Sequence, residues 1–203
     1  MSRERIGTDF VRRPGSAWEV LADLVRVAGF ASVVAAAIGW GPTDVAVLFL
    51  AASAALVLRM LGLRGGVDAL TGAVILVAAW SGVLDLYAAI AWWDVAIHVV
   101  CTGVIVVVGM LVLARTGVVA HPSAESTPSF VAIALATTLG LALSALWEIV
   151  EWLGHNLVDE AIFVDYDDTI GDIVAGGAGA VLAGLLVATV RLERVSPDED
   201  RAR

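Results

Sequence analysis

WDVAIHVVCTGVIVVVGMLVLAR, residues 93–115, decides the fold of this chain. An aspartate and a histidine stand near its beginning, an arginine ends it, and the residues between them are almost all apolar. At about 1.5 Å per residue, a helix of this length crosses the roughly 30 Å hydrocarbon core of a bilayer. The stretch therefore predicts a transmembrane helix whose two ends carry different kinds of charge.

Comparable apolar stretches recur along the chain. The hydrophobic fraction is 60%, whereas an ordinary soluble domain is nearer half apolar, so this composition excludes one. The expected spans besides the one quoted are residues 16–40, 44–63, 68–87, 129–152 and 168–190. We expect the helix of residues 129–152 to continue to His155. The predicted fold is an all-α, polytopic helical membrane bundle with about six transmembrane helices in residues 16–190, between a loose N-terminal arm (1–15) and a C-terminal tail (191–203).

The basic residues predict the orientation of this bundle. The chain has no lysine, and in a six-span arrangement its arginines all fall at the two termini or at the 2–3 and 4–5 connections. Because positively charged connections stay on the cytoplasmic side, both termini are expected to be cytoplasmic. The bilayer is thus the expected partner. The chain has no basic patch, which argues against binding of nucleic acid.

Ionisable residues gather at the opposite, extracytoplasmic end of three predicted helices. Helical spacing of three, four or seven residues places each set on one face of its helix. The candidate ligands are Asp94 and His98 on the fourth span, Glu148, Glu151 and His155 on the fifth, and Asp168 and Asp172 on the sixth. Carboxylates at membrane depth without arginine or lysine need a metal ion, a cationic ligand or a proton.

Facing helices that carry carboxylates and imidazoles at these spacings are typical of metal sites in bundles. Mixed ligands suit Zn²⁺, Mn²⁺ or Fe²⁺, and a purely carboxylate subset suits Mg²⁺ or Ca²⁺. The sequence therefore predicts a divalent metal ion of unspecified identity, with Glu148 and Glu151 as candidate general bases. The alternatives to metal ligation are structural roles. Asp94 and Asp168 could be helix N-caps, and acids such as Asp159 could lie at solvated helix ends.

Three function classes remain open at this stage. The first is a metal-binding protein or metal-dependent enzyme that takes a lipid-linked substrate from the outer leaflet. The second is a cation- or proton-coupled transporter, which would need polar groups through the inner half of the bundle. The third is a non-catalytic scaffold subunit whose carboxylates are protonated or paired with a partner's arginines. The oligomeric state is not determined by these patterns.

The combination of Trp93-Asp94 with His98, Trp147-Glu148 with Glu151-Trp152, and Asp167-Asp168 with Asp172 and a glycine-rich run resembles the YjdF-type family of predicted bacterial inner-membrane proteins. The resemblance covers roughly residues 68–190. The spacing is similar, more distantly, to that of VanZ-like membrane proteins. The resemblance implies a compact helical bundle in the bacterial cytoplasmic membrane and no particular substrate or catalytic residue.

Overall fold

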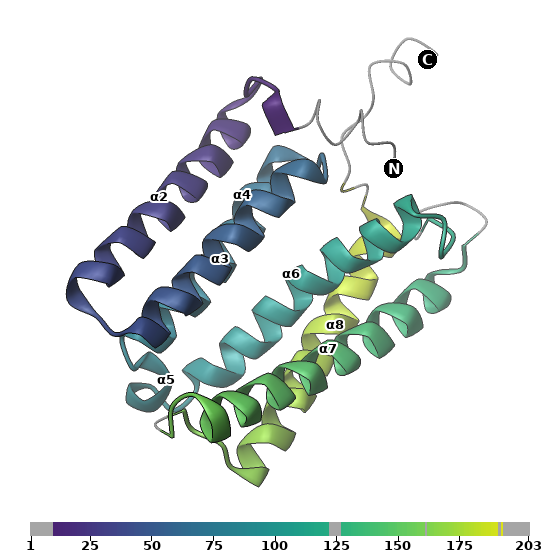
Figure 1. Cartoon of the computed structure of the whole chain (residues 1–203). Coiled ribbons are helices and arrows are strands. Elements are labelled where there is room, and N and C mark those ends of the chain that lie inside the picture. The colour runs from purple at the N-terminus through teal and green to yellow at the C-terminus, as the bar shows by residue number, and fades with distance from the viewer. Residues whose placement is uncertain (1–9, 122–126, 161, 191, 193–203) are drawn as a thin grey trace.

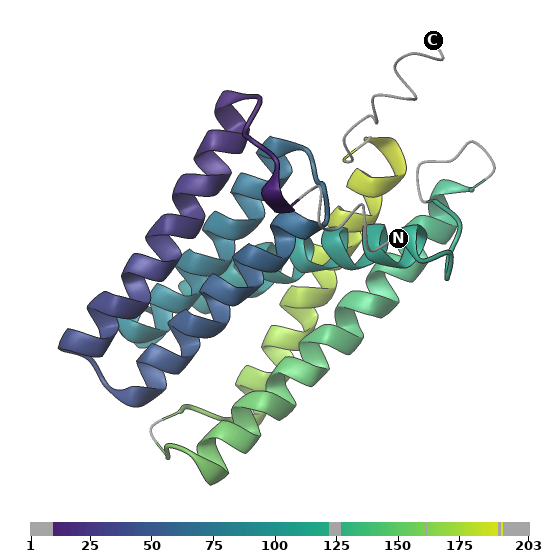
Figure 2. The same cartoon turned by 45° about the horizontal axis from the view of Figure 1, so that its top comes forward.

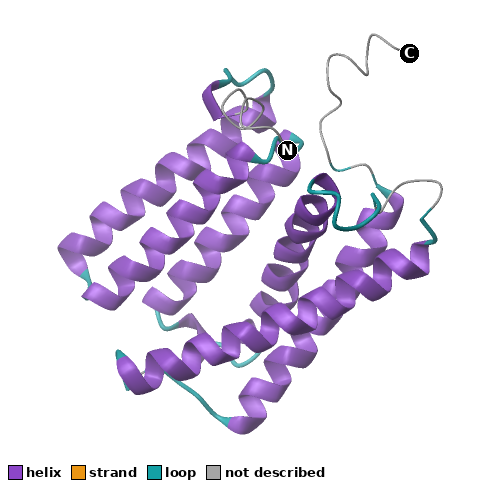
Figure 3. Ribbon diagram, turned by 45° about the vertical axis from the view of Figure 1, so that its right-hand side comes forward, coloured by secondary structure: helices purple, strands orange, loops and turns teal. Residues whose placement is uncertain are grey.

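Helices account for all the regular structure that the computed structural model describes, in residues 10–121, 127–160, 162–190 and 192 (Figure 3). Six helices are long and apolar enough to cross a membrane, which confirms the predicted all-α membrane bundle. They are α2 (Ala17–Gly39), α3 (Pro42–Met60), α4 (Gly65–Val83), α6 (Trp93–Arg115), α7 (Ser129–Leu157) and α8 (Tyr166–Thr189), and the short α5 (Leu86–Ala89) joins α4 to α6. The ends of the predicted arm and tail, residues 1–9 and 193–203, lie outside the described residues.

The long helices form two groups of three (Figures 1 and 2). Helices α2, α3 and α4 pack on one another and make the N-terminal bundle, while α6, α7 and α8 pack on one another and make the C-terminal bundle. Among the long helices described, α4 and α6 make the main contact between the two bundles. A buried apolar cluster that includes Leu58, Leu63, Val106 and Met110 also joins the bundles.

Most predicted helix boundaries hold within a few residues, and one differs for a local reason. The third span was expected to run to Tyr87, but α4 ends at Val83. Asp85 has a φ of 52°, in the left-handed region that a right-handed helix cannot continue through, so the chain turns there and restarts as α5. The predicted extension of the fifth span to His155 is confirmed, because α7 continues to Leu157.

The start of α2 also follows the sequence pattern. The Ser16 hydroxyl accepts a hydrogen bond from the Glu19 backbone N–H at 3.3 Å, as a capping residue does. The Glu19 carboxylate accepts from the backbone N–H of Gly15 at 2.7 Å, one residue before the cap. The reciprocal contact of a capping box is thus displaced by one residue.

Charged side chains tie the N-terminal bundle together at the arginine-rich end, defined by Arg26, Arg59, Arg64 and Arg115. Arg26 is buried, and it donates to the Asp68 carboxylate at 2.5 Å, to Asp23 at 3.0 Å and to the Ala55 carbonyl at 2.9 Å. Arg59 donates to the backbone carbonyls of Phe10 and Arg12, in the described part of the predicted arm. These contacts join α2 to α3 and α4, and join residues 10–12 to α3.

Small residues let the helices of the C-terminal bundle approach closely. A Cβ at Gly179 on α8 would overlap the Val99 carbonyl of α6, and a Cβ at Gly140 on α7 would overlap the Cβ of Ala180. Close backbone approach at glycine and alanine is the usual packing of helices in membranes. Because of this packing, side chains one or two turns away on three different helices are brought to the same depth.

Candidate metal centre

The three helices of the C-terminal bundle meet at a pair of hydroxyl groups. The Thr102 Oγ1 of α6 and the Ser144 Oγ of α7 lie 3.4 Å apart. On α8, a Cβ at Gly176 would overlap the Ser144 hydroxyl and would lie 2.9 Å from Thr102 Oγ1, so only glycine leaves room for the pair. We call Thr102 and Ser144 the hydroxyl pair.

Three ionisable residues follow one helical turn from this meeting point. His98 is four residues from Thr102, Glu148 is four residues from Ser144, and Asp172 is four residues from Gly176. Since α7 runs antiparallel to α6 and α8, all three steps lead toward the same end, about 6 Å along the helix axes. We call this the acid-rich end.

Asp94, His98 and Asp172 bring one ligand atom each to within 4.8 Å of one another. His98 Nε2 lies 3.5 Å from Asp94 Oδ1 and 3.7 Å from Asp172 Oδ2. These separations exceed the usual hydrogen-bond range of about 2.7–3.2 Å. Two ligand atoms that each lie about 2.1 Å from a tetrahedral ion are about 3.4 Å apart, so the observed spacing fits a shared metal ion.

Glu148 lies outside this triad but in the same region. Glu148 is only 8% exposed, and its Oε1 is buried with no hydrogen-bond partner among the described residues. The Thr169 hydroxyl lies beside the carboxylate, and Asp94 and Asp168 are close enough to act on it electrostatically. Of the residues predicted as ligands, the triad contains Asp94, His98 and Asp172 but not Glu148.

The remaining predicted ligands do not join the triad. Glu151 is half-buried and interacts electrostatically with Glu148, Asp94 and Asp172. His155 points its Nδ1 toward the Ile162 carbonyl at 2.7 Å, to which the ring N–H donates, so this nitrogen bonds to backbone and not to the triad. The described residues between α7 and α8 contain no helix.

The N-cap alternatives for two of the aspartates are wrong. Asp165 caps α8, because its carboxylate accepts from the backbone N–H of Asp167 at 3.0 Å. Asp168 is therefore inside the first turn of α8. Asp94 likewise lies in the first turn of α6, where Trp92 occupies the N-cap position. Both carboxylates are consequently free of backbone capping and are available to the centre.

Two aromatic side chains and Ser144 also shape the surroundings of the centre. Tyr87 donates its hydroxyl to the Ala78 carbonyl at 2.9 Å, and burial followed by the charge of Asp94 raises the pKa of its phenol, which stays neutral. The Trp93 indole donates to Ser81 on α4 at 2.9 Å and holds the start of α6 against the N-terminal bundle. Ser144 was missed because one serine in an apolar helix carries no distinctive pattern.

The polar region ends directly below the hydroxyl pair. One further turn toward the arginine-rich end, Val106 and Ala180 are completely buried and pack against Gly140. From there to the arginine-rich ends of α6, α7 and α8, the described helices carry no ionisable side chain before Arg115. Among the described residues of these three helices, ionisable side chains therefore adjoin the centre only at the acid-rich end.

Comparison with known proteins adds the family. A model of the family described as "Predicted membrane protein (DUF2238)" matches residues 19–193, which is most of the chain. The chain belongs to this family. No curated protein and no solved structure matches it. Family membership agrees with the six membrane-spanning helices, and the likenesses to YjdF-type and VanZ-like proteins stay predictions from the sequence.

Proposed function

We propose that this integral membrane protein binds a divalent metal ion through Asp94, His98 and Asp172 and uses it in a metal-dependent reaction. The observation that supports the proposal is the spacing of the three ligand atoms, which is too wide for hydrogen bonds and fits ligands of one ion. The two carboxylates and the imidazole suit Zn²⁺, Mn²⁺ or Fe²⁺.

Three protein ligands leave a coordination position for water or substrate, as in catalytic metal sites. A bound ion would lower the pKa of such a water or polarise a carbonyl or phosphoryl oxygen. Glu148 and Glu151 are the carboxylates nearest to the triad on α7 and are the candidate general bases. The arginine distribution supports an extracytoplasmic location for this chemistry, and we propose a bacterial cytoplasmic membrane as its setting.

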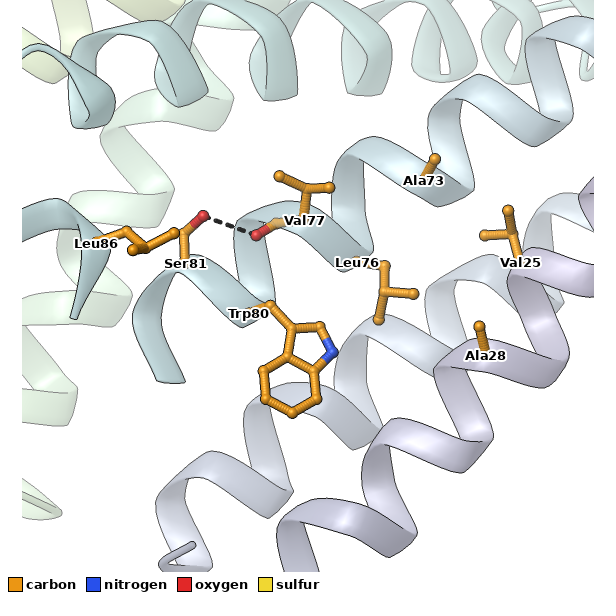
Figure 4. A pocket seen from close by; sticks show the side chains of 8 residues that line it. All are labelled: Val25, Ala28, Ala73, Leu76, Val77, Trp80, Ser81 and Leu86. Atoms are coloured by element: carbon orange, nitrogen blue, oxygen red, sulfur yellow. Dashed lines mark hydrogen bonds between the residues drawn. The ribbon is translucent and has the colours of Figure 1, made fainter. Parts of the chain in front are cut away.

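An apolar cavity supports a lipid-linked substrate. A space of about 310 Å³ lies between α2 and α4, with Val25, Leu76 and Trp80 among its lining residues (Figure 4). Its lining also includes Ser81, which accepts from the indole of Trp93, the residue before Asp94. The cavity therefore extends to the residues that hold the start of α6. An acyl or prenyl chain in this cavity would have its head group toward the acid-rich end.

The transporter alternative is disfavoured by the packing beneath the centre. Val106, Gly140 and Ala180 fill the path below the hydroxyl pair, and a coupled ion would have no polar group to follow there. A non-catalytic scaffold remains the second candidate, because buried carboxylates such as Glu148 also fit a protonated group or a partner's arginine.

Thermal unfolding of the detergent-purified protein tests metal binding. An ion at one hundred times its dissociation constant stabilises the folded state by about 2.7 kcal/mol. At about 2–4 °C per kcal/mol for a chain of this size, chelation should lower Tm by about 5–11 °C, and added Mn²⁺ or Zn²⁺ should restore it.

The variant Asp172→Asn is the control, since it lacks a carboxylate of the triad and its Tm should respond little to chelator. A wild-type Tm that neither chelator nor added divalent ions change at neutral pH would remove the metal proposal and favour the scaffold.

A further inference from the structure

We infer that the acid-rich end holds a second divalent cation, bound between Glu148 and Asp172 above the hydroxyl pair of Thr102 and Ser144. This inference rests on the metal ion proposed above for Asp94, His98 and Asp172. Asp172 would bridge the two ions, one on each side of its carboxylate.

The first observation is the unpartnered oxygen of Glu148. Its Oε1 is buried without a hydrogen-bond partner among the described residues, although the residue as a whole is only 8% exposed. A buried acceptor without a partner costs free energy, and more so if it is charged. A cation beside Oε1 removes this cost.

The second observation is the register of α7 and α8. The two helices touch where Ser144 meets Gly176, and Glu148 and Asp172 each lie four residues from that contact in the direction of the acid-rich end. The carboxylates therefore stand at the same depth on facing helices. Asp172 also lies 3.7 Å from His98 Nε2 on its other neighbour, α6. A carboxylate between two sets of ligands is the usual bridge of two-metal sites, whose ions are about 3.5–4 Å apart.

Charge balance points the same way. One divalent ion balances the carboxylates of Asp94 and Asp172 and leaves Glu148 unbalanced. Asp168 and Asp94 add further negative potential at Glu148. The described arginines of the long helices lie at the opposite end, so none offsets these carboxylates. A second divalent ion brings the total charge of the region closer to zero.

The hydroxyl pair supplies oxygen ligands beneath this position. Ser81 and Thr137 donate to the carbonyl four residues earlier at 2.8 Å, which is the common arrangement in helices. Thr102 and Ser144 instead face each other across α6 and α7 at 3.4 Å. A ligand set of two carboxylates and two hydroxyls contains oxygen alone, which suits Mg²⁺, Ca²⁺ or Mn²⁺. Mn²⁺ suits both ion positions and is the probe of choice.

The test is the stoichiometry of Mn²⁺ binding to the full chain in detergent, measured by equilibrium dialysis and by electron paramagnetic resonance. The wild type should bind two Mn²⁺ per chain, with a spectrum broadened by magnetic coupling between neighbouring ions. Glu148→Leu should bind one Mn²⁺, with the resolved spectrum of an isolated ion. The control is Glu160→Leu, which removes an exposed carboxylate in the connection to α8 and should retain two coupled ions.

The possible outcomes separate this inference from the proposed function. One uncoupled ion in the wild type, or two ions in Glu148→Leu, would overturn the second cation and leave the first intact. No bound ion in the wild type would overturn both. If Glu148→Leu fails to fold, Ser144→Ala takes its place, and it should weaken the second ion while the first keeps its wild-type affinity.

Discussion

Replacing Gly179 with alanine tests how the close packing of α6 and α8 builds the centre. A Cβ at Gly179 would overlap the Val99 carbonyl oxygen and would lie 2.8 Å from the Val99 carbonyl carbon. These are backbone atoms within α6, and they cannot move aside as the end of a flexible side chain can. The two helices must therefore separate.

The magnitude follows from two opposing terms. Overpacking of a well-packed interior costs about 1–3 kcal/mol, and contact with backbone places Gly179→Ala near about 3 kcal/mol. Alanine favours the helix over glycine by about 1 kcal/mol. The net loss is about 2 kcal/mol, or a Tm lowered by about 4–8 °C for a chain of this size. Val99 follows His98, so separation of the helices should also weaken metal binding.

Thermal unfolding in detergent, followed by tryptophan fluorescence, measures this loss. The control is Gly171→Ala on the same helix, where an added Cβ meets nothing within 4 Å. It should raise Tm by up to about 2–4 °C, because the helix propensity gain of about 1 kcal/mol meets no opposing cost. Equal Tm changes in the two variants would refute the argument from packing.

Two further predictions concern the arginine-rich end and the orientation. Arg26→Met should cost about 3–5 kcal/mol in the same unfolding assay, because it leaves buried Asp68 without its cation. Asp68→Asn should cost less, since Arg26 keeps Asp23 and the Ala55 carbonyl, and equal costs would contradict this account. In intact cells, a membrane-impermeant maleimide should label Glu160→Cys but not Gly7→Cys. Labelling of Gly7→Cys from outside would overturn the proposed orientation.

Most of the fold was predictable because a bilayer imposes strong constraints on a sequence. A transmembrane span must be long and apolar, so stretches such as residues 93–115 can be recognised as spans from the sequence. The end of α4 was not predictable, because the apolar run continues to Tyr87. No residue pattern in that run indicates the left-handed φ of Asp85. The hydrogen bonds from Arg59 to the carbonyls of Phe10 and Arg12 were missed for a related reason. Every residue has a backbone carbonyl, so the sequence does not indicate which carbonyls accept from a distant side chain.

The centre was predictable as a region and not as a geometry. Helical spacing correctly placed Asp94 with His98 on one face of α6, and Asp172 on the packed face of α8. The rotation of three helices about one another decides which atoms come within 4.8 Å, and that rotation depends on contacts such as Gly176 against Ser144. Sequence spacing within single helices cannot give these contacts between helices.

The metal content of the purified protein tests the central claim most directly. Elemental analysis should be made on wild-type protein purified in detergent without chelator, and on Asp172→Asn prepared in parallel. The account predicts a divalent transition metal bound stoichiometrically to the wild type, removed by chelator and strongly reduced in Asp172→Asn, because Asp172 belongs to the triad. A wild type without bound metal, or a variant with as much metal as the wild type, would contradict it.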